Sequence, residues 1–200
     1  MGQVGELRVK ESDRLGLVAA NLALRCSSRI DRLVINGSGS AFNTEDQLAR
    51  FVDRIRESYR PTLAESSPEA WRKRLEGTVF DVRAVPCELL AVLPLCYAQP
   101  WAVDCWDETV DAMQTPARFR PFRILDRLEA LDLPTLVVWG RDDQGGIYES
   151  AAAAVARMPR AQLAVFERCA HLPMLEHPTR YNALVRDFLL SAPRDGSVEA

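Results

Sequence analysis

Two short apolar runs with a helical stretch between them form the clearest pattern in the chain. Residues 134–139 and 162–166 are rich in β-branched and other apolar side chains, and turn-forming or charged residues flank them. This pattern is typical of buried parallel strands. Residues 148–158 lie between the runs and have helical character, so we expect a strand–helix–strand unit within one sheet.

The preceding part of the chain extends this pattern. Apolar positions at helical spacing predict a helix over residues 14–26, and a strand follows over residues 30–35. Residues 44–122 differ, because their apolar side chains recur at helical intervals between prolines. That arrangement predicts several short helices joined by turns, and the interrupting prolines are Pro61, Pro68, Pro86 and Pro100. The fold class indicated is therefore α/β with a helical segment inside it.

Two more helices are expected toward the C-terminus. They cover residues 125–131 and 179–190, and Thr179 is the expected N-cap of the second. The polar residues 192–200 that follow predict a flexible tail.

Composition narrows the choice of partners. The chain has 48% hydrophobic and 26% charged residues, which is ordinary for a globular protein, and its formal net charge is −3. Dispersed basic residues give no electrostatic footprint for nucleic acid or for an anionic membrane, so we expect neither partner. A small neutral or weakly charged molecule fits better.

The five cysteines and the N-terminus indicate the compartment. The cysteines are odd in number and follow no metal-ligand spacing, which favours reduced thiols and argues against a structural metal or a disulfide framework. The first residues lack the apolar core of a secretory signal, and no apolar run reaches the length of a membrane span. We therefore expect a cytoplasmic protein.

Candidate chemistry lies where the two clearest strands end. Asp142 and Asp143 follow the first strand, and His171 lies in the loop after the second. Carboxyl ends of parallel strands meet at one edge of a sheet, so a carboxylate and the histidine are expected side by side. A carboxylate that orients a histidine base needs this proximity, as in a catalytic triad. The alternative is that the aspartates are turn residues and His171 is a structural histidine.

At these residues the chain resembles the α/β-hydrolase superfamily. That superfamily has Gly-x-x-Asp after a late strand and Gly-His-x-Pro-x-x-Glu-x-Pro before the last helix. The matching segments here are residues 140–143 and 170–178, with Ala170 in place of the second motif's first glycine. The resemblance implies that Asp143 is the triad acid and His171 the base, while Asp142 points elsewhere.

The resemblance also implies a domain organisation. Residues 1–43 and 123–191 correspond to the α/β-hydrolase core, and residues 44–122 correspond to a helical cap inserted over the active site. The likeness runs from about Leu7 to Leu190 but covers only about the carboxyl-terminal two thirds of the superfamily's domain. The front strands are missing from the match, so we expect a partial α/β-hydrolase fold. A truncated product, an upstream start site or strands supplied by a partner would each account for this.

The nucleophile is the open question. The superfamily places it in a Gly-x-Ser-x-Gly elbow before a helix, and alignment of that helix puts the elbow on residues 11–15. Asp13 then occupies the nucleophile position and Ser12 precedes it, while Glu11 and Leu15 replace the glycines. Three interpretations remain: Ser12 as a displaced serine nucleophile, Asp13 as a carboxylate nucleophile, or an inert segment that caps the helix. An incomplete sheet would also leave an exposed strand edge, which predicts either a homo-oligomer or poor stability.

Within the superfamily, the cap segment is most similar to hydrolases that cleave meta-cleavage products of aromatic degradation. Cys169, two residues before His171, suits that group. The group usually has tryptophan after the histidine, where this chain has Leu172, and a cap arginine for the substrate carboxylate, which has no match near Ala98. Candidate residues for an apolar substrate pocket are Trp71, Trp101, Trp106 and Leu172, although aromatic residues on packed helices often form only a core.

The leading hypothesis is a hydrolase that acts on a small apolar carbonyl substrate, at an ester or a carbon–carbon bond. His171 is the general base, Asp143 fixes its tautomer, and Ser12 or Asp13 is the nucleophile if there is one. No cofactor and no metal are implied. The alternative is a non-catalytic remnant of the fold that binds a small molecule or a partner chain.

Overall fold

A parallel sheet of three strands forms the centre of the protein, in a computed structural model that describes residues 14–191. The strands are β1 (Leu33–Asn36), β2 (Thr135–Gly140) and β3 (Ala161–Phe166), in the order β1-β2-β3. Thr135 of β2 lies opposite Leu33 on one side and Ala161 on the other. Every residue of β2 is buried, as expected for the middle strand of a parallel sheet.

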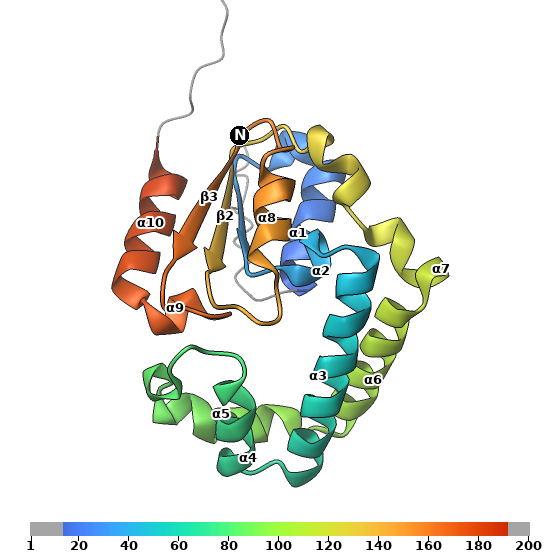
Figure 1. Ribbon diagram of the computed structural model, residues 1–200, viewed down its shortest axis with the longest axis vertical. Helices are drawn as coiled ribbons and strands as arrows, with labels where there is room; N and C mark the ends of the chain where they lie inside the picture. Colours follow the sequence, from blue (N-terminus) through green and yellow to red (C-terminus); the bar gives the residue numbers. More distant parts are fainter. Residues whose placement is uncertain (1–13, 192–200) are drawn as a thin grey trace, which may run out of the picture.

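Helices cover both faces of this sheet, so the chain has the α/β layering that the sequence predicted (Figure 1). On one face lie α1 (Arg14–Arg25) and α8 (Tyr148–Val155), which pack against the larger core cluster. On the other face α10 (Pro178–Leu190) buries Tyr181 and Phe188 against Leu136 and Val138 of β2. Two short helices, α2 (Gly39–Phe42) and α9 (Pro173–Glu176), follow β1 and β3 at the carboxyl edge of the sheet.

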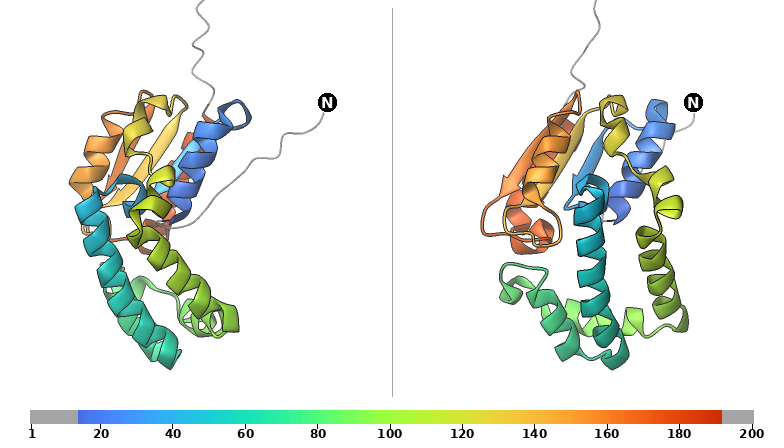
Figure 2. Two further views of the ribbon diagram at one scale, coloured as in Figure 1. Left: turned by 90° about the vertical axis from the view of Figure 1, so that its right-hand side faces the viewer. Right: turned by 45° about the vertical axis from the view of Figure 1, so that its right-hand side comes forward.

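The segment between β1 and β2 is helical and extends away from the sheet. Helices α3 (Glu45–Glu65) and α6 (Pro100–Gln114) run side by side, and α4 (Pro68–Glu76) and α5 (Cys87–Tyr97) lie across from the sheet edge (Figure 2). The segment closes with α7 (Pro116–Phe119), and three 3₁₀ turns complete the connections at Val82–Ala84, Arg120–Phe122 and Leu125–Ala130. We call residues 44–122 the cap segment.

Local sequence signals set where two of these helices begin. Thr44 and Gln47 form a reciprocal capping box at the start of α3, with the Gln47 side chain accepting the Thr44 amide at 2.8 Å. The Ser67 hydroxyl accepts the Ala70 amide at the start of α4, where Pro68 occupies the first helical position. These caps satisfy backbone donors that the helices leave unpaired.

Several boundaries differ from the sequence prediction. The first strand is shorter than residues 30–35, because a 3₁₀ turn over Ser27–Arg29 ends at Ile30 and pairing begins at Leu33. The helix predicted over residues 125–131 is a 3₁₀ helix, Leu125–Ala130, with a kink at Arg127, rather than an α-helix. The predicted Thr179 cap is wrong, since α10 begins at Pro178 and no side chain caps it.

Pro61 does not end its helix, contrary to the prediction. Helix α3 continues through Pro61 to Glu65 and ends at Ser66, which has a left-handed φ of 49°. The two residues after Pro61, Thr62 and Leu63, are buried and stabilise the continued helix by packing. Within residues 14–191, no helix is both long enough and apolar enough to cross a bilayer.

Candidate active site

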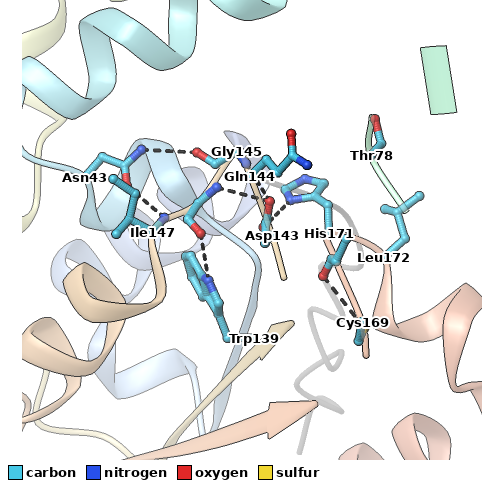
Figure 3. Close-up of polar contacts among 12 residues, drawn as sticks. Asn43, Thr78, Trp139, Asp143, Gln144, Gly145, Ile147, Cys169, His171 and Leu172 are labelled. Carbon is cyan, nitrogen blue, oxygen red and sulfur yellow. Dashed lines mark hydrogen bonds and ion pairs between the residues drawn. The ribbon is translucent and has the colours of Figure 1, made fainter. Parts of the chain in front are cut away.

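Asp143 and His171 form a hydrogen-bonded pair at the carboxyl edge of the sheet (Figure 3). Asp143 Oδ2 lies 2.8 Å from His171 Nδ1, and the exposed fractions of the two side chains are 2% and 14%. Asp143 comes from the loop after β2 and His171 from the loop after β3. The structure therefore brings together the two residues that the strand–helix–strand pattern placed at one edge.

The loop after β2 holds the Asp143 carboxylate rigidly. Its other oxygen, Oδ1, accepts the amides of Gly145 at 2.8 Å and Gly146 at 3.1 Å. The Trp139 indole donates to the Gly146 carbonyl at 3.1 Å, which fixes the loop to the buried strand (Figure 3). Asp143 thus accepts hydrogen bonds on both oxygens, an arrangement that orients the carboxylate toward the histidine.

Asp142 points away from the histidine, as the resemblance implied. Its Oδ2 accepts the Cys169 amide at 3.3 Å, and its own amide donates to the Cys169 carbonyl at 2.9 Å. These bonds join the loops that follow β2 and β3. Gly140 permits the approach, because a Cβ there would lie 1.9 Å from the Ala170 carbonyl oxygen.

A cavity of about 890 Å³ lies between the cap segment and this edge of the sheet. Asp143, His171 and Leu172 line its floor, and α3 to α6 supply its other walls. Among the proposed pocket tryptophans, Trp71 and Trp106 line the cavity with their side chains largely buried, in an aromatic cluster with Tyr59.

Trp101 lies elsewhere. Its side chain is 64% exposed, and it lines a separate, smaller hollow of about 320 Å³ on α5 and α6 together with Cys96 and Cys105. The exposure of Trp101 could not be predicted from the sequence. Helical spacing shows which residues share one side of a helix, but not whether that side faces the cavity or solvent.

Arg74 is a cavity-lining residue that the sequence analysis did not single out. Its guanidinium lies 4.2 Å from the centre of the Tyr59 ring and donates to the Thr78 hydroxyl at 2.5 Å. No Asp or Glu of the described chain lies within 4.0 Å of the Arg74 guanidinium. The arginines that do form ion pairs lie mostly on the surface. A half-buried guanidinium without a carboxylate partner is a candidate anion-binding group.

The start of α1 also lies at this edge. A Cβ at Gly16 would lie 2.6 Å from Ser38 Cβ. Gly37 directly precedes Ser38 in the sequence, and a Cβ at Gly37 would lie 3.1 Å from His171 Nδ1. The first turn of α1 therefore packs against the loop that contacts the histidine. Ser12 and Asp13, the proposed nucleophiles, lie outside the described residues, as does the predicted tail over 192–200.

Other reactive groups near the pair are few. Burial and the neighbouring Glu176 carboxylate raise the pKa of the Cys169 thiol, so this cysteine stays protonated and is a poor nucleophile. Across residues 14–191, no group of three or more His, Cys, Asp or Glu side chains is placed to hold a metal ion.

Comparison with known proteins finds relatives that are named as hydrolases. The chain is 30% identical over 190 residues to the 2-hydroxy-6-oxo-6-phenylhexa-2,4-dienoate hydrolase of Delftia acidovorans, covering 93% of this chain and 63% of that protein. It is 31% identical over 202 residues to the 2-hydroxymuconate semialdehyde hydrolase of Pseudomonas sp. strain CF600, covering 96% and 66%. The chain thus spans slightly less than two thirds of the length of these relatives.

Solved structures show the same fold. A 2-hydroxy-6-oxo-6-phenylhexa-2,4-dienoate hydrolase from Rhodococcus sp. strain RHA1 superposes with a TM-score of 0.70 at 19% identity, over 90% of this chain and 62% of that one. A meta-cleavage product hydrolase from Pseudomonas fluorescens IP01 gives 0.66 at 26% identity, over 94% and 65%. The profile of the Alpha/beta hydrolase family matches residues 16–184, which include the whole described sheet and the Asp143–His171 pair. By fold and by sequence, the chain belongs to the alpha/beta hydrolase family.

Proposed function

We propose that this protein is a hydrolase in which His171 acts as general base and Asp143 orients it. The observation that carries the proposal is the 2.8 Å contact between Asp143 Oδ2 and His171 Nδ1, with the histidine lining a cavity of about 890 Å³. When Nδ1–H donates to the carboxylate, the neutral imidazole carries its lone pair on Nε2. That nitrogen can then remove a proton from a nucleophile.

The proposed nucleophile is Ser12, Asp13 or a water molecule. The position of α1 supports the first two, because the described helix begins at Arg14 and its first turn packs beside the loop that touches His171. A Ser12 hydroxyl would lose its proton to His171, attack the carbonyl carbon and leave an acyl-enzyme after the protonated histidine returns the proton to the leaving group. Water, activated by the same histidine, would then release the acid.

We propose a substrate of the meta-cleavage type, a carbonyl compound that is cleaved at a carbon–carbon bond. The relatives named above act on such compounds, and one of them is a dienoate, which bears a carboxylate. Arg74 offers this chain a partner for that group, since it lines the cavity and has no carboxylate of residues 14–191 within 4.0 Å. Trp71 and Trp106 supply apolar walls for the rest of the substrate.

The role of Arg74 can be tested by Arg74→Gln. Loss of a charged hydrogen bond to a substrate carboxylate is expected to raise KM about 10-fold to 100-fold for the dienoate. A neutral p-nitrophenyl ester should show little change in KM, because it has no carboxylate to bind. Arg72→Gln is the control, since Arg72 is exposed on the same helix and does not line the cavity. Equal effects on both substrates would contradict the role.

The central experiment follows hydrolysis of 2-hydroxy-6-oxo-6-phenylhexa-2,4-dienoate and of short p-nitrophenyl esters. His171→Ala should lower kcat about 100-fold to 10,000-fold, the usual contribution of a general base. Ser12→Ala and Asp13→Ala, measured separately, identify the nucleophile by which of them removes activity; if neither does, water attacks directly. A folded wild-type protein that hydrolyses neither substrate class would refute the proposal and favour a non-catalytic binding protein.

A further inference from the structure

One carboxylate, that of Glu176 at the end of α9, binds the backbone on both sides of His171. Glu176 Oε1 accepts the Ala170 amide at 3.0 Å and the Leu172 amide at 3.2 Å. Its contact with the Cys169 thiol, at 3.5 Å, adds a weaker donor from the same loop. Because the residues before and after the histidine are both held, the backbone of His171 has little freedom to rotate.

The same carboxylate also binds the cap segment. Glu176 Oε2 accepts the Phe80 amide at 2.6 Å, across 96 residues of sequence. Phe80 lies in the irregular stretch between α4 and α5, which approaches α9 in Figure 1. Two oxygens of one side chain therefore connect the histidine loop to the cap.

A second set of contacts joins the same two segments. The His171 amide donates to the Thr78 carbonyl at 2.9 Å, and Figure 3 shows Thr78 beside His171 and Leu172. The Arg168 guanidinium lies 5.5 Å from the centre of the Phe80 ring. Thr78 in turn accepts a hydrogen bond from Arg74, the proposed anion-binding residue. The cap stretch from Thr78 to Phe80 is thus joined to the histidine loop at two points, directly by the His171–Thr78 backbone hydrogen bond and through the Glu176 side chain at Phe80.

We propose that Glu176 is a positioning residue that aligns the His171 ring with Asp143 by fastening the histidine loop to the cap. The carboxylate accepts hydrogen bonds from three amides at once, those of Phe80, Ala170 and Leu172. These amides belong to the cap segment and to the histidine loop, whose relative position sets the floor of the cavity. The effect of Glu176 on turnover rests on the function proposed above. Its effect on the Asp143–His171 hydrogen bond does not, and this separates the two proposals in an experiment.

Glu176→Gln is the discriminating variant, because it keeps the size of the side chain but leaves only one oxygen. Whichever way the amide turns, its NH₂ group faces either the Phe80 amide or the Leu172 amide, and two donors cannot bond, whereas the Ala170 amide contacts both oxygens, at 3.0 and 3.2 Å, and keeps an acceptor. Glu176→Ala removes both acceptors. Glu167→Gln is the control, since Glu167 is exposed in the same loop and, among the described residues, its carboxylate pairs with Arg141 alone.

Amide hydrogen exchange and the NMR signal of the His171 Nδ1 proton are measured first, because neither requires activity. In Glu176→Gln, exchange at Phe80 or at Leu172 is expected to rise about 10-fold to 100-fold, as for a lost charged hydrogen bond. In Glu176→Ala both amides should exchange faster and the Nδ1 proton signal should broaden or disappear. Glu167→Gln should leave all three signals unchanged.

Turnover is measured second. A misplaced base is expected to lower kcat about 100-fold in Glu176→Ala with little change in KM. If Glu176 had a purely structural role, its substitution would lower the melting temperature, while the Nδ1 signal and the kcat of the folded fraction would stay as in wild type. That result would overturn the proposal. An inactive wild-type enzyme whose Nδ1 signal still depends on Glu176 would refute the proposed function and leave the positioning role intact.

Discussion

Gly140→Ala tests whether close contact between two strand-end loops holds the candidate site together. A Cβ at this position would lie 1.9 Å from the Ala170 carbonyl oxygen and 2.5 Å from that of Cys169. Both obstacles are backbone atoms, so no side-chain rotation can relieve the overlap. The histidine loop would have to move away from β2, and the Asp142–Cys169 backbone bond of 2.9 Å would stretch with it.

The expected cost lies at the upper end for overpacking, about 3 kcal/mol. For a protein of this size that corresponds to a fall in melting temperature of roughly 6–12 °C. Thermal unfolding followed by circular dichroism measures the shift. Because Ala170 precedes His171, kcat should fall as well, even at temperatures where the variant is fully folded.

Gly77→Ala is the matched control. A Cβ at Gly77 would meet only the Arg74 carbonyl oxygen, at an ordinary 3.8 Å, and the backbone φ of −87° suits any residue. We expect a change within about 0.5 kcal/mol. If Gly140→Ala were as mild as this control, the two loops would not be packed as described and the argument for a rigid site would fail.

Three further results are expected. Asp143→Asn should lower kcat on the order of 10,000-fold by favouring the wrong imidazole tautomer, with kinetics under substrate saturation as the measurement. Burial raises the pKa of the Cys169 thiol, so its contribution to stability is complete below the unfolded value of about 8.5 and is lost as pH rises; urea midpoints should fall more steeply above that pH in wild type than in Cys169→Ala. Trp71→Ala should cost about 3–5 kcal/mol because the side chain is buried, whereas Trp101→Ala, with 64% of its side chain exposed, should change the unfolding free energy by less than about 0.5 kcal/mol.

The sheet and the acid–base pair could be predicted because both depend on short-range pattern. Apolar runs indicated β2 and β3 to within a residue, and parallel pairing then required their following loops to share an edge. The closeness of these two loops also explains the glycine of the Gly-x-x-Asp motif. Gly140 is needed because carbonyls of the next loop occupy the space that a Cβ would fill.

Features that depend on distant contacts could not be predicted. Pro61 stays inside α3 because the helix continues into buried Thr62 and Leu63, which sequence spacing alone does not show. Glu176 binds backbone amides only a few residues away, beside His171, yet it also binds Phe80 in the cap. Nothing in the spacing of two residues 96 positions apart indicates that they meet.

The three strand-end loops act as one unit at the edge of the sheet. Gly37 follows β1 with a φ of 55°, a backbone conformation that favours glycine, and a Cβ there would lie 3.1 Å from His171 Nδ1. Asp143 follows β2 and bonds the same nitrogen, while the loop after β3 supplies His171 itself. Gly16 allows the first turn of α1 to pack against Ser38, next to Gly37. The start of the helix, the acid and the base therefore lie close together, and the contacts at Gly16 and Gly37 leave little room for a side chain. Such packing makes the position of His171 sensitive to every loop that touches it, and we therefore expect catalysis to respond to changes at Gly37, Gly140 and Glu176 as well as to loss of the pair.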